Sequence, residues 1–364
     1  MKRIIISMAT MVFCLLVLFS CSKSTVNYTQ DGNWVSKSDF GGTNRSEAVV
    51  FTINDIAYVG TGLDVNSKRL KDFWSYDPTD NNWFQLADLG KGSPDSALAS
   101  PRNSAVAFSV NNIGYVGTGY DGFNPLSDFW SYDPTANTWA HKANFAAGNS
   151  NIIPRFDAIA FSIGNFGYLG TGNDGNGNYL KDFWQYDPTS DSWTPKVSYG
   201  GAKRAGAVCW VYNNKGYVVS GVNGSGSSVN DFWVFDPSQP DAQAWTELRH
   251  INNFSTDTYD DGYTTIVRSN AVAFVINGTA GSGDGNDKAY IACGNNGALT
   301  NLVWEYDFKT DLWKEKAPYE GGAREGAVGF SVKNRGFVAL GRSSTAANDD
   351  TREFKPNDVA NAND

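Results

Sequence analysis

Six arginines recur along the chain in the same local sequence and could together bind an anion. Guanidinium groups hold carboxylates through paired, charge-assisted hydrogen bonds, so several of them around one opening would form an anion site. Successive arginines are separated by 57, 53, 49, 64 and 56 residues, which indicates one arginine in each unit of a repeat. The six are Arg45, Arg102, Arg155, Arg204, Arg268 and Arg324.

Acids and amides follow these arginines, and they differ from one unit to the next. One or two positions after an arginine stand Glu47, Asn103, Asp157, Asn270 and Glu325. Carboxylates beside a bound sugar can exchange protons with it, and amides can bind its hydroxyl groups. We therefore predict that these residues and the arginines line a site for a polar ligand. The alternative is that the arginines pair with loop carbonyls and that the acids and amides are solvated starts of loops.

Each arginine opens a stretch that predicts four short strands separated by turns. Gly164-Asn165 is a two-residue hairpin signal, and Asp187-Pro188 is a turn in which proline presets φ. A unit of this size cannot bury both of its faces alone, so the units must pack against one another. In the clearest unit the predicted strands are Arg155–Ile163, Phe166–Thr171, Asp182–Tyr186 and a strand at Trp193.

Three further features repeat in register with the arginine. The second strand ends in a glycine, a Tyr-Asp-Pro or a weakened form of it follows the third strand, and a tryptophan marks the fourth. The glycines are Gly62, Gly119, Gly172, Gly221, Gly294 and Gly341, and the tryptophans are Trp83, Trp139, Trp193, Trp245 and Trp313.

With these features the chain resembles the kelch family of β-propellers, from about Val26 to Asn357. The resemblance implies an all-β fold, a six-bladed propeller with four antiparallel strands per blade. Family blades usually end the second strand in two glycines, whereas here the first is replaced, for example by Thr61. In a propeller the first strand of each blade lines the axis. The six arginines would then lie on the rim formed by the fourth-to-first and second-to-third strand loops.

The last unit stops without its tryptophan, which predicts how the ring closes. Asn33-Trp34-Val35 resembles the fourth-strand segment Asn82-Trp83-Phe84, so the N-terminal strand should complete the sixth blade. Its expected partner is a weak third strand at Thr351–Pro356. Closure would remove the exposed edges of an open array. We place the propeller at residues 28–357 and a polar tail at 358–364.

The first 20 residues predict a lipoprotein signal peptide. Lys2 and Arg3 precede an apolar run, and Leu18-Phe19-Ser20-Cys21 resembles the bacterial lipobox. Cys21 would carry the lipid, residues 21–27 would form a short tether, and the protein would be anchored to the bacterial cell envelope. The alternative is ordinary secretion, in which Cys21 has no role. Whether the anchor would face the periplasm or the cell surface stays open.

Charge limits the classes of partner. The formal net charge is −9, and it becomes −11 without Lys2 and Arg3, which disfavours nucleic acid and anionic lipid as partners. The membrane contact would be through the lipid alone. The loop Asp174–Asn178 lacks the turn glycine and the glutamate of a calcium loop. The only two histidines, His141 and His250, follow fourth-strand tryptophans of different units and would lie too far apart for a copper oxidase site. We expect no metal and no cofactor.

Two functions follow from this sequence. The first is a non-catalytic binding module that holds a glycan or an envelope protein through the rim. The second is a sugar mutarotase or epimerase, because bacterial sialic-acid mutarotases are six-bladed propellers of the same family. It would need an acid/base pair and an arginine for the sugar carboxylate. We favour the first function, because nothing in the sequence demands catalysis.

Overall fold

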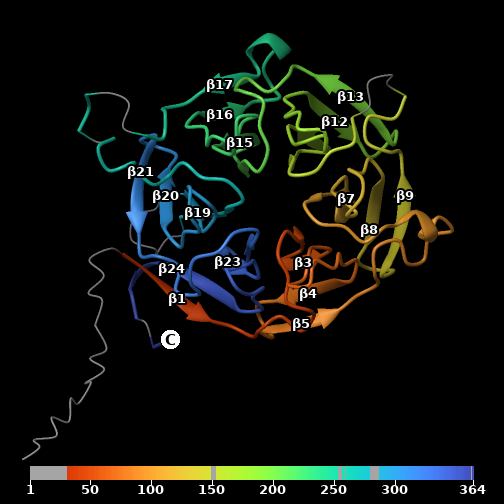
Figure 1. The fold of residues 1–364 in the computed structure, drawn as a ribbon, viewed down its shortest axis with the longest axis horizontal. Coiled ribbons are helices and arrows are strands. Elements are labelled where there is room, and N and C mark those ends of the chain that lie inside the picture. Colours follow the sequence, from red (N-terminus) through yellow and green to blue (C-terminus); the bar gives the residue numbers. More distant parts are fainter. Residues whose placement is uncertain (1–30, 149–152, 253–255, 259, 279–286, 362) are drawn as a thin grey trace, which may run out of the picture.

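The computed structural model describes residues 31–148, 153–252, 256–258, 260–278, 287–361 and 363–364. Within these ranges, six antiparallel sheets of four strands surround a central axis (Figure 1). This confirms the predicted six-bladed propeller with four strands per blade. The predicted signal peptide, Cys21 and the tether lie outside the described residues.

In blades one to five the four strands follow one another in the sequence, so that neighbouring strands in the sheet are joined by the shortest connections. Two short 3₁₀ helices, η1 (Ser96–Leu98) and η2 (Asp241–Gln243), lie in connections on the outside of the ring. Blades one to three consist of β2 (Val49–Ile53), β3 (Ile56–Gly60), β4 (Phe73–Asp77), β5 (Asn82–Gln85), β6 (Val106–Val110), β7 (Ile113–Gly117), β8 (Phe129–Asp133), β9 (Thr138–Lys142), β10 (Ile159–Ile163), β11 (Phe166–Gly170), β12 (Phe183–Asp187) and β13 (Ser192–Lys196). Blades four and five consist of β14 (Val208–Tyr212), β15 (Lys215–Val219), β16 (Phe232–Phe235), β17 (Trp245–Glu247), β18 (Val272–Ile276), β19 (Lys288–Ala292), β20 (Val303–Asp307) and β21 (Leu312–Lys316).

The sixth blade joins the two ends of the described chain. It contains β22 (Val328–Val332), β23 (Arg335–Ala339), β24 (Thr351–Val359) and β1 (Asp31–Ser36). Strand β1 pairs with β24, and Trp34 lies opposite Phe354. Trp34 is fully buried, which fixes the N-terminal strand to the blade. The predicted closure is therefore confirmed, and β24 runs two residues past the predicted end of the propeller at 357.

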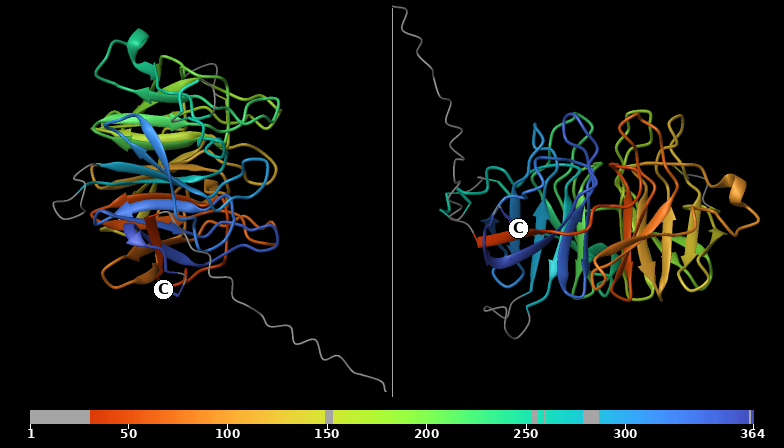
Figure 2. Two further views of the ribbon diagram at one scale, coloured as in Figure 1. Left: turned by 90° about the vertical axis from the view of Figure 1, so that its left-hand side faces the viewer. Right: turned by 90° about the horizontal axis from the view of Figure 1, so that it is seen from below.

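The two faces of the ring differ in the length of the connections between strands. In every blade except the fifth, where β18 ends at Ile276 and β19 begins at Lys288, two-residue turns join the first and second strands. In the first blade the turn residues Asn54 and Asp55 have φ of 49° and 62°. Such pairs of left-handed residues form the type I′ turns that match strand twist. The second-to-third strand loops are longer and project from the other face, which is at the top of the right-hand view of Figure 2. We call this face the mouth face and the one with the short turns the opposite face.

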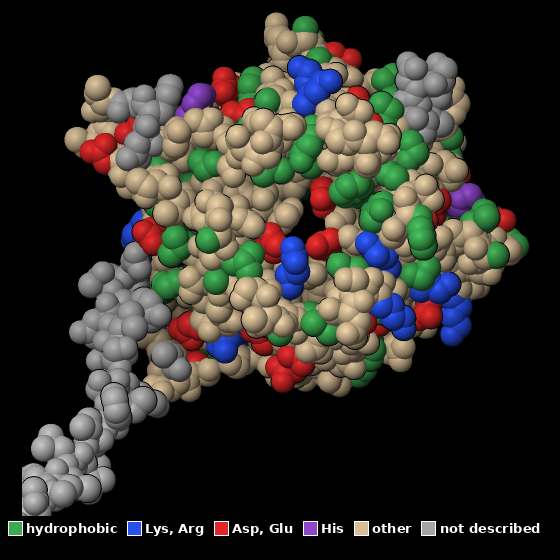
Figure 3. Space-filling model, in the orientation of Figure 1, with side chains coloured by type: hydrophobic (Ala, Val, Ile, Leu, Met, Phe, Trp, Pro, Cys, Tyr) green, Lys and Arg blue, Asp and Glu red, His purple; other side chains and the backbone are tan. Residues whose placement is uncertain are grey.

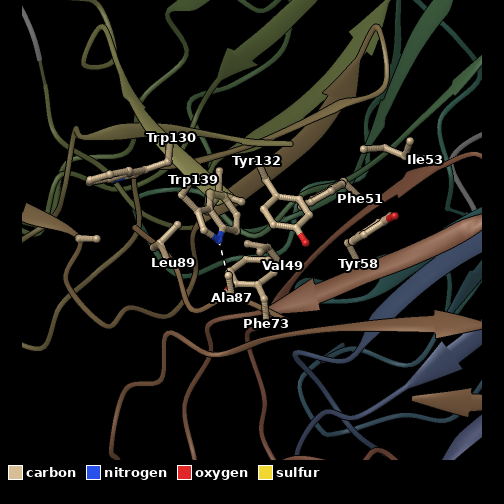
Figure 4. Close-up of a cluster of buried hydrophobic side chains, with 12 residues drawn as sticks. Val49, Phe51, Ile53, Tyr58, Phe73, Ala87, Leu89, Trp130, Tyr132 and Trp139 are labelled. Carbon is tan, nitrogen blue, oxygen red and sulfur yellow. Dashed lines mark hydrogen bonds between the residues drawn. The ribbon is translucent and has the colours of Figure 1, made fainter. Parts of the chain in front are cut away.

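Aromatic side chains fill the spaces between blades. Trp139 on β9 packs against Phe73 on β4 of the preceding blade, with ring centroids 4.7 Å apart (Figure 4). Its indole Nε1 donates to the Ala87 carbonyl oxygen at 3.0 Å. Trp193 contacts Phe129 in the same way, which extends the arrangement around the ring. The fourth-strand tryptophans therefore pack each blade against the preceding one.

Candidate functional site

The six arginines lie buried behind the mouth, in contrast to the predicted ring of exposed guanidinium groups. Their exposed fractions are 0–1%. In blade one, Nη1 and Nη2 of Arg45 donate to the two carboxylate oxygens of Asp72 at 2.8 and 2.7 Å. Nη1 also donates to the Thr61 carbonyl oxygen at 3.0 Å. Arg45 thus ties the start of its blade to the loop before β4, and its charge is compensated there.

Four other blades repeat this pairing. The acids are Asp128, Asp182, Asp231 and Asp350, which pair with Arg102, Arg155, Arg204 and Arg324. Burial opposes ionisation of Asp72, but hydrogen bonds and charge from Arg45 lower the pKa of this carboxyl overall. The expectation that the arginines form an anion site at the mouth is therefore wrong. Because an interior guanidinium needs a partner, the chain uses these six for its scaffold.

Blade five departs from the pattern. Leu302 occupies the position of the aspartate, and the guanidinium of Arg268 donates only to backbone carbonyl oxygens. Two of these belong to Cys293 and Leu302, each at 2.8 Å. Burial lowers the pKa of Arg268 to about 10. Even here the arginine is fully enclosed and cannot reach a ligand.

The residues two positions after the arginines do converge on the axis. They line a cavity of about 140 Å³ at the mouth, which we call the throat. All six have left-handed backbones, with φ between 51° and 61°. Each N–H donates to the carbonyl oxygen of its counterpart in the preceding blade at 2.7–3.0 Å, so that six hydrogen bonds close a circle. The members are Glu47, Ser104, Asp157, Gly206, Asn270 and Gly326.

Carboxylates dominate the electrostatics of the throat. Figure 3 shows acidic side chains gathered around the central opening. Glu47 accepts hydrogen bonds from Asn103 Nδ2 at 2.6 Å and from Ser104 Oγ at 2.8 Å. Burial and the charge of Glu47 raise the pKa of Asp157 to about 7. The structure thus brings the predicted acids and amides together and places the arginines elsewhere.

Two arginines that the sequence analysis did not select lie on the rim of the throat. Arg69 donates to the Asn103 side-chain oxygen at 2.9 Å and lies over the ring of Tyr120 at 5.1 Å. Arg342 pairs with Glu325 at 2.5 Å, and its side chain is half exposed. Arg342 directly follows the repeat glycine, where the other blades have uncharged residues. This difference between the blades could have identified Arg342 as a candidate site residue from the sequence.

Aromatic side chains border the same opening. The rings of Tyr120 and Phe156 lie 5.4 Å apart and belong to blades two and three. Phe123, in the loop between β7 and β8, is 87% exposed. A ligand at the mouth would therefore meet apolar ring faces outside and carboxyl and amide groups inside.

A channel continues from the throat along the axis. Its wall is formed by the first strand of every blade, as predicted, and small side chains such as Ala48 and Ala105 leave it open. Cys209 also lines this wall, and burial raises the pKa of its thiol to about 12. No group of three or more His, Cys, Asp or Glu side chains in the described ranges is arranged to hold a metal ion. Across those same ranges, no helix has the length and apolar character needed to cross a membrane.

Comparison with known proteins gives the same architecture. A family model described as the KLHDC2/KLHL20/DRC7 Kelch-repeats domain matches residues 24–203. A solved structure titled "Structure of YjhT" shares 15% sequence identity, with a TM-score of 0.65. The alignment covers 86% of this chain and 95% of that one. The search of curated proteins gave no match.

Proposed function

The chain is a kelch-repeat β-propeller, and on that premise we propose that it is a non-catalytic binding module whose ligand enters the throat. The fold supports a binding or scaffold role in general. The observation that carries the proposal is the convergence of unlike polar side chains on one open cavity, while the repeated arginines are used internally. Ligand sites are concave and have a few convergent polar groups, as the throat does.

The chemistry of the throat suits a polar, hydroxyl-rich or amide-rich partner. Ser104 and Asn270 line the cavity and offer hydrogen bonds, and the partly exposed ring of Tyr120 offers an apolar face at the rim. We propose a glycan or a protein segment of the cell envelope as the partner. Like charges in the throat disfavour an anionic group there, since Glu47 and Asp157 already repel one another.

An array of glycans and peptides tests the proposal. We expect the wild type to bind at least one class of probe, and Ser104→Ala with Asn270→Ala to abolish that binding, because both side chains line the cavity. Gln85→Ala is the matched control, because this exposed amide lies on the outer strand β5. Equal binding by the double variant and the wild type would place the binding surface elsewhere.

A mutarotase or epimerase is the second candidate, and the pKa of Asp157 favours it. A carboxyl group with a pKa of about 7 can act as acid or base near neutral pH. The carboxylate of the sugar substrate would have to pair with Arg342 or Arg69, because the six repeat arginines are enclosed. Anomer equilibration of N-acetylneuraminate, followed by proton NMR, tests this function. No acceleration over buffer, or equal acceleration by Asp157→Asn, would argue against it.

We also propose that the propeller is held at the bacterial envelope by a lipid on Cys21. The support is the sequence alone: a basic start, an apolar run and a cysteine where cleavage is expected.

A further inference from the structure

A second cavity lies on the opposite face, between blades four and five. Its volume is about 390 Å³, within the range of small-molecule sites. The turn between β14 and β15 forms one side, and the turn after β20 forms the other. We call it the blade 4/5 groove, and its principal residues are Tyr212, Lys215, Tyr217, Asp287, Phe308 and Lys309.

Two departures from the repeat create this groove. Tyr212 ends the first strand of blade four, where the other blades have isoleucine or valine. Phe308 follows the third strand of blade five, where the other blades have proline. The two rings stack with centroids 3.8 Å apart and planes at 18°. Tyr217 meets Phe308 edge-on at 5.3 Å, so three aromatic rings form one wall.

Two of the three charged groups that line the groove already have polar partners. Lys215 contacts Asp236 at 3.0 Å. Asp287 accepts from the Gly278 amide at 2.7 Å, and its hydrogen bond with Tyr212 raises the pKa of that hydroxyl. Lys309 is exposed and forms no ion pair with any residue that the structure describes. One ammonium group is therefore available to a ligand beside the aromatic wall.

We propose that the blade 4/5 groove binds a sugar ring that carries a carboxylate. The aromatic wall offers flat apolar contact to one face of the ring, and the tyrosine and lysine side chains offer polar groups at its edge. The ammonium of Lys309 would pair with the carboxylate. This site is separate from the throat, and its ligand preference is opposite, because the throat is acidic.

Calorimetric titration with glucuronate, using glucose as the neutral probe, tests the proposal. We expect saturable binding of glucuronate that weakens with added salt, and weaker binding of glucose. Lys309→Gln should reduce glucuronate affinity about tenfold, to the level of glucose. Tyr212→Val and Phe308→Pro restore the residues of the other blades, so they should fold and lose binding of both sugars.

Lys333→Gln is the matched control, because this exposed lysine lies in the turn between β22 and β23 on the same face, and it should leave glucuronate binding unchanged. The proposal is overturned if glucuronate does not bind, if glucose binds equally well, or if Lys309→Gln has no effect. Lys309 is exposed, so its variant reports on the site even if the aromatic variants unfold.

Discussion

At the scale of single residues, the buried arginines show how a repeated charge can be structural. Arg102 pairs with Asp128 at 2.5 Å, and Asp128 also accepts from Trp130 Nε1 at 2.6 Å. Asp128 therefore provides hydrogen-bond acceptors to both Arg102 and Trp130. Truncating one partner of a buried pair leaves the remaining charge without compensation, and this costs more than the pair contributes.

We predict that Asp128→Asn lowers the free energy of unfolding by about 3 kcal/mol. The reason is that Arg102 remains enclosed with only carbonyl partners. Urea denaturation followed by tryptophan fluorescence measures the change. Asp121→Asn, in an exposed loop of the same blade, is the control and should have a small effect. Equal midpoints for Asp128→Asn and the wild type would contradict the scaffold role of the pair.

Asp157 predicts a pH dependence of stability. Its pKa rises from 3.8 to about 7 on folding, so the folded state holds a proton that the unfolded chain has released. The contribution of Asp157 to the stability of the wild type should therefore fall as pH rises from about 4 to 7. Asp157→Asn removes the dependence, and the difference in melting temperature between the two proteins should grow over that interval. A constant difference would mean that Asp157 is ionised in the fold.

At the scale of elements, the closing strand carries its own charge cluster. Glu353 on β24 is buried and contacts Lys37, just after β1, at 3.0 Å. It also pairs with Arg335 on β23 at 2.5 Å. Burial opposes ionisation, but the hydrogen bonds from Arg335, Lys355 and Lys37 lower the pKa of Glu353 to about 2. The carboxylate thus links three strands of the sixth blade.

This cluster should stabilise the fold at neutral pH, and its contribution to stability should be lost in acid. Because the folded pKa is depressed, the contribution of Glu353 is complete above about pH 4.5 and is lost as pH falls towards 2. Glu353→Gln should lower the melting temperature at pH 7, and the loss should shrink between pH 4.5 and 2. A loss that is the same at both pH values would show that packing, rather than charge, is responsible.

Trp34 should be the main apolar contribution of the closing strand. Its ring contacts Tyr319 at 4.7 Å and Phe354 at 4.6 Å, which join blades five and six. Trp34→Ala should cost about 3–5 kcal/mol of unfolding free energy. Deleting residues 22–40 should lower the melting temperature further, because the ring then opens. Unchanged stability of the deletion variant would contradict closure by β1.

At the scale of the whole molecule, the repeats in the sequence and their resemblance to the kelch family together predicted the architecture, including closure by the segment around Trp34. The pairing of arginine with the aspartate before the third strand was not predicted, because it depends on how adjacent strands are staggered. Of the throat residues, Glu47, Asp157 and Asn270 were predicted, but the circle of backbone hydrogen bonds was not. Its six members have unlike side chains and share only a left-handed backbone. The blade 4/5 groove joins Tyr212 and Phe308 from different blades, which no local pattern reveals.

Attachment to a membrane is the property of the whole molecule that rests on sequence alone. Cys21→Ala should move the protein from the membrane fraction to the soluble fraction, since a single residue would carry the lipid. Metabolic labelling with a fatty-acid analogue gives an independent measurement. A labelled or membrane-bound Cys21→Ala variant would contradict the lipoprotein prediction.

The six amide-to-carbonyl hydrogen bonds of the throat run in one direction around the axis and return to their start. A helix has two ends with unpaired groups and an axial dipole, but a closed circle has no end, and the in-plane components of its peptide dipoles cancel. The circle of hydrogen bonds therefore gives the mouth no net dipole in the plane of the ring. The charged side chains Glu47 and Asp157 set the sign of the mouth, so exchanging them could convert a mouth that disfavours anions into one that accepts them while the circle stays intact.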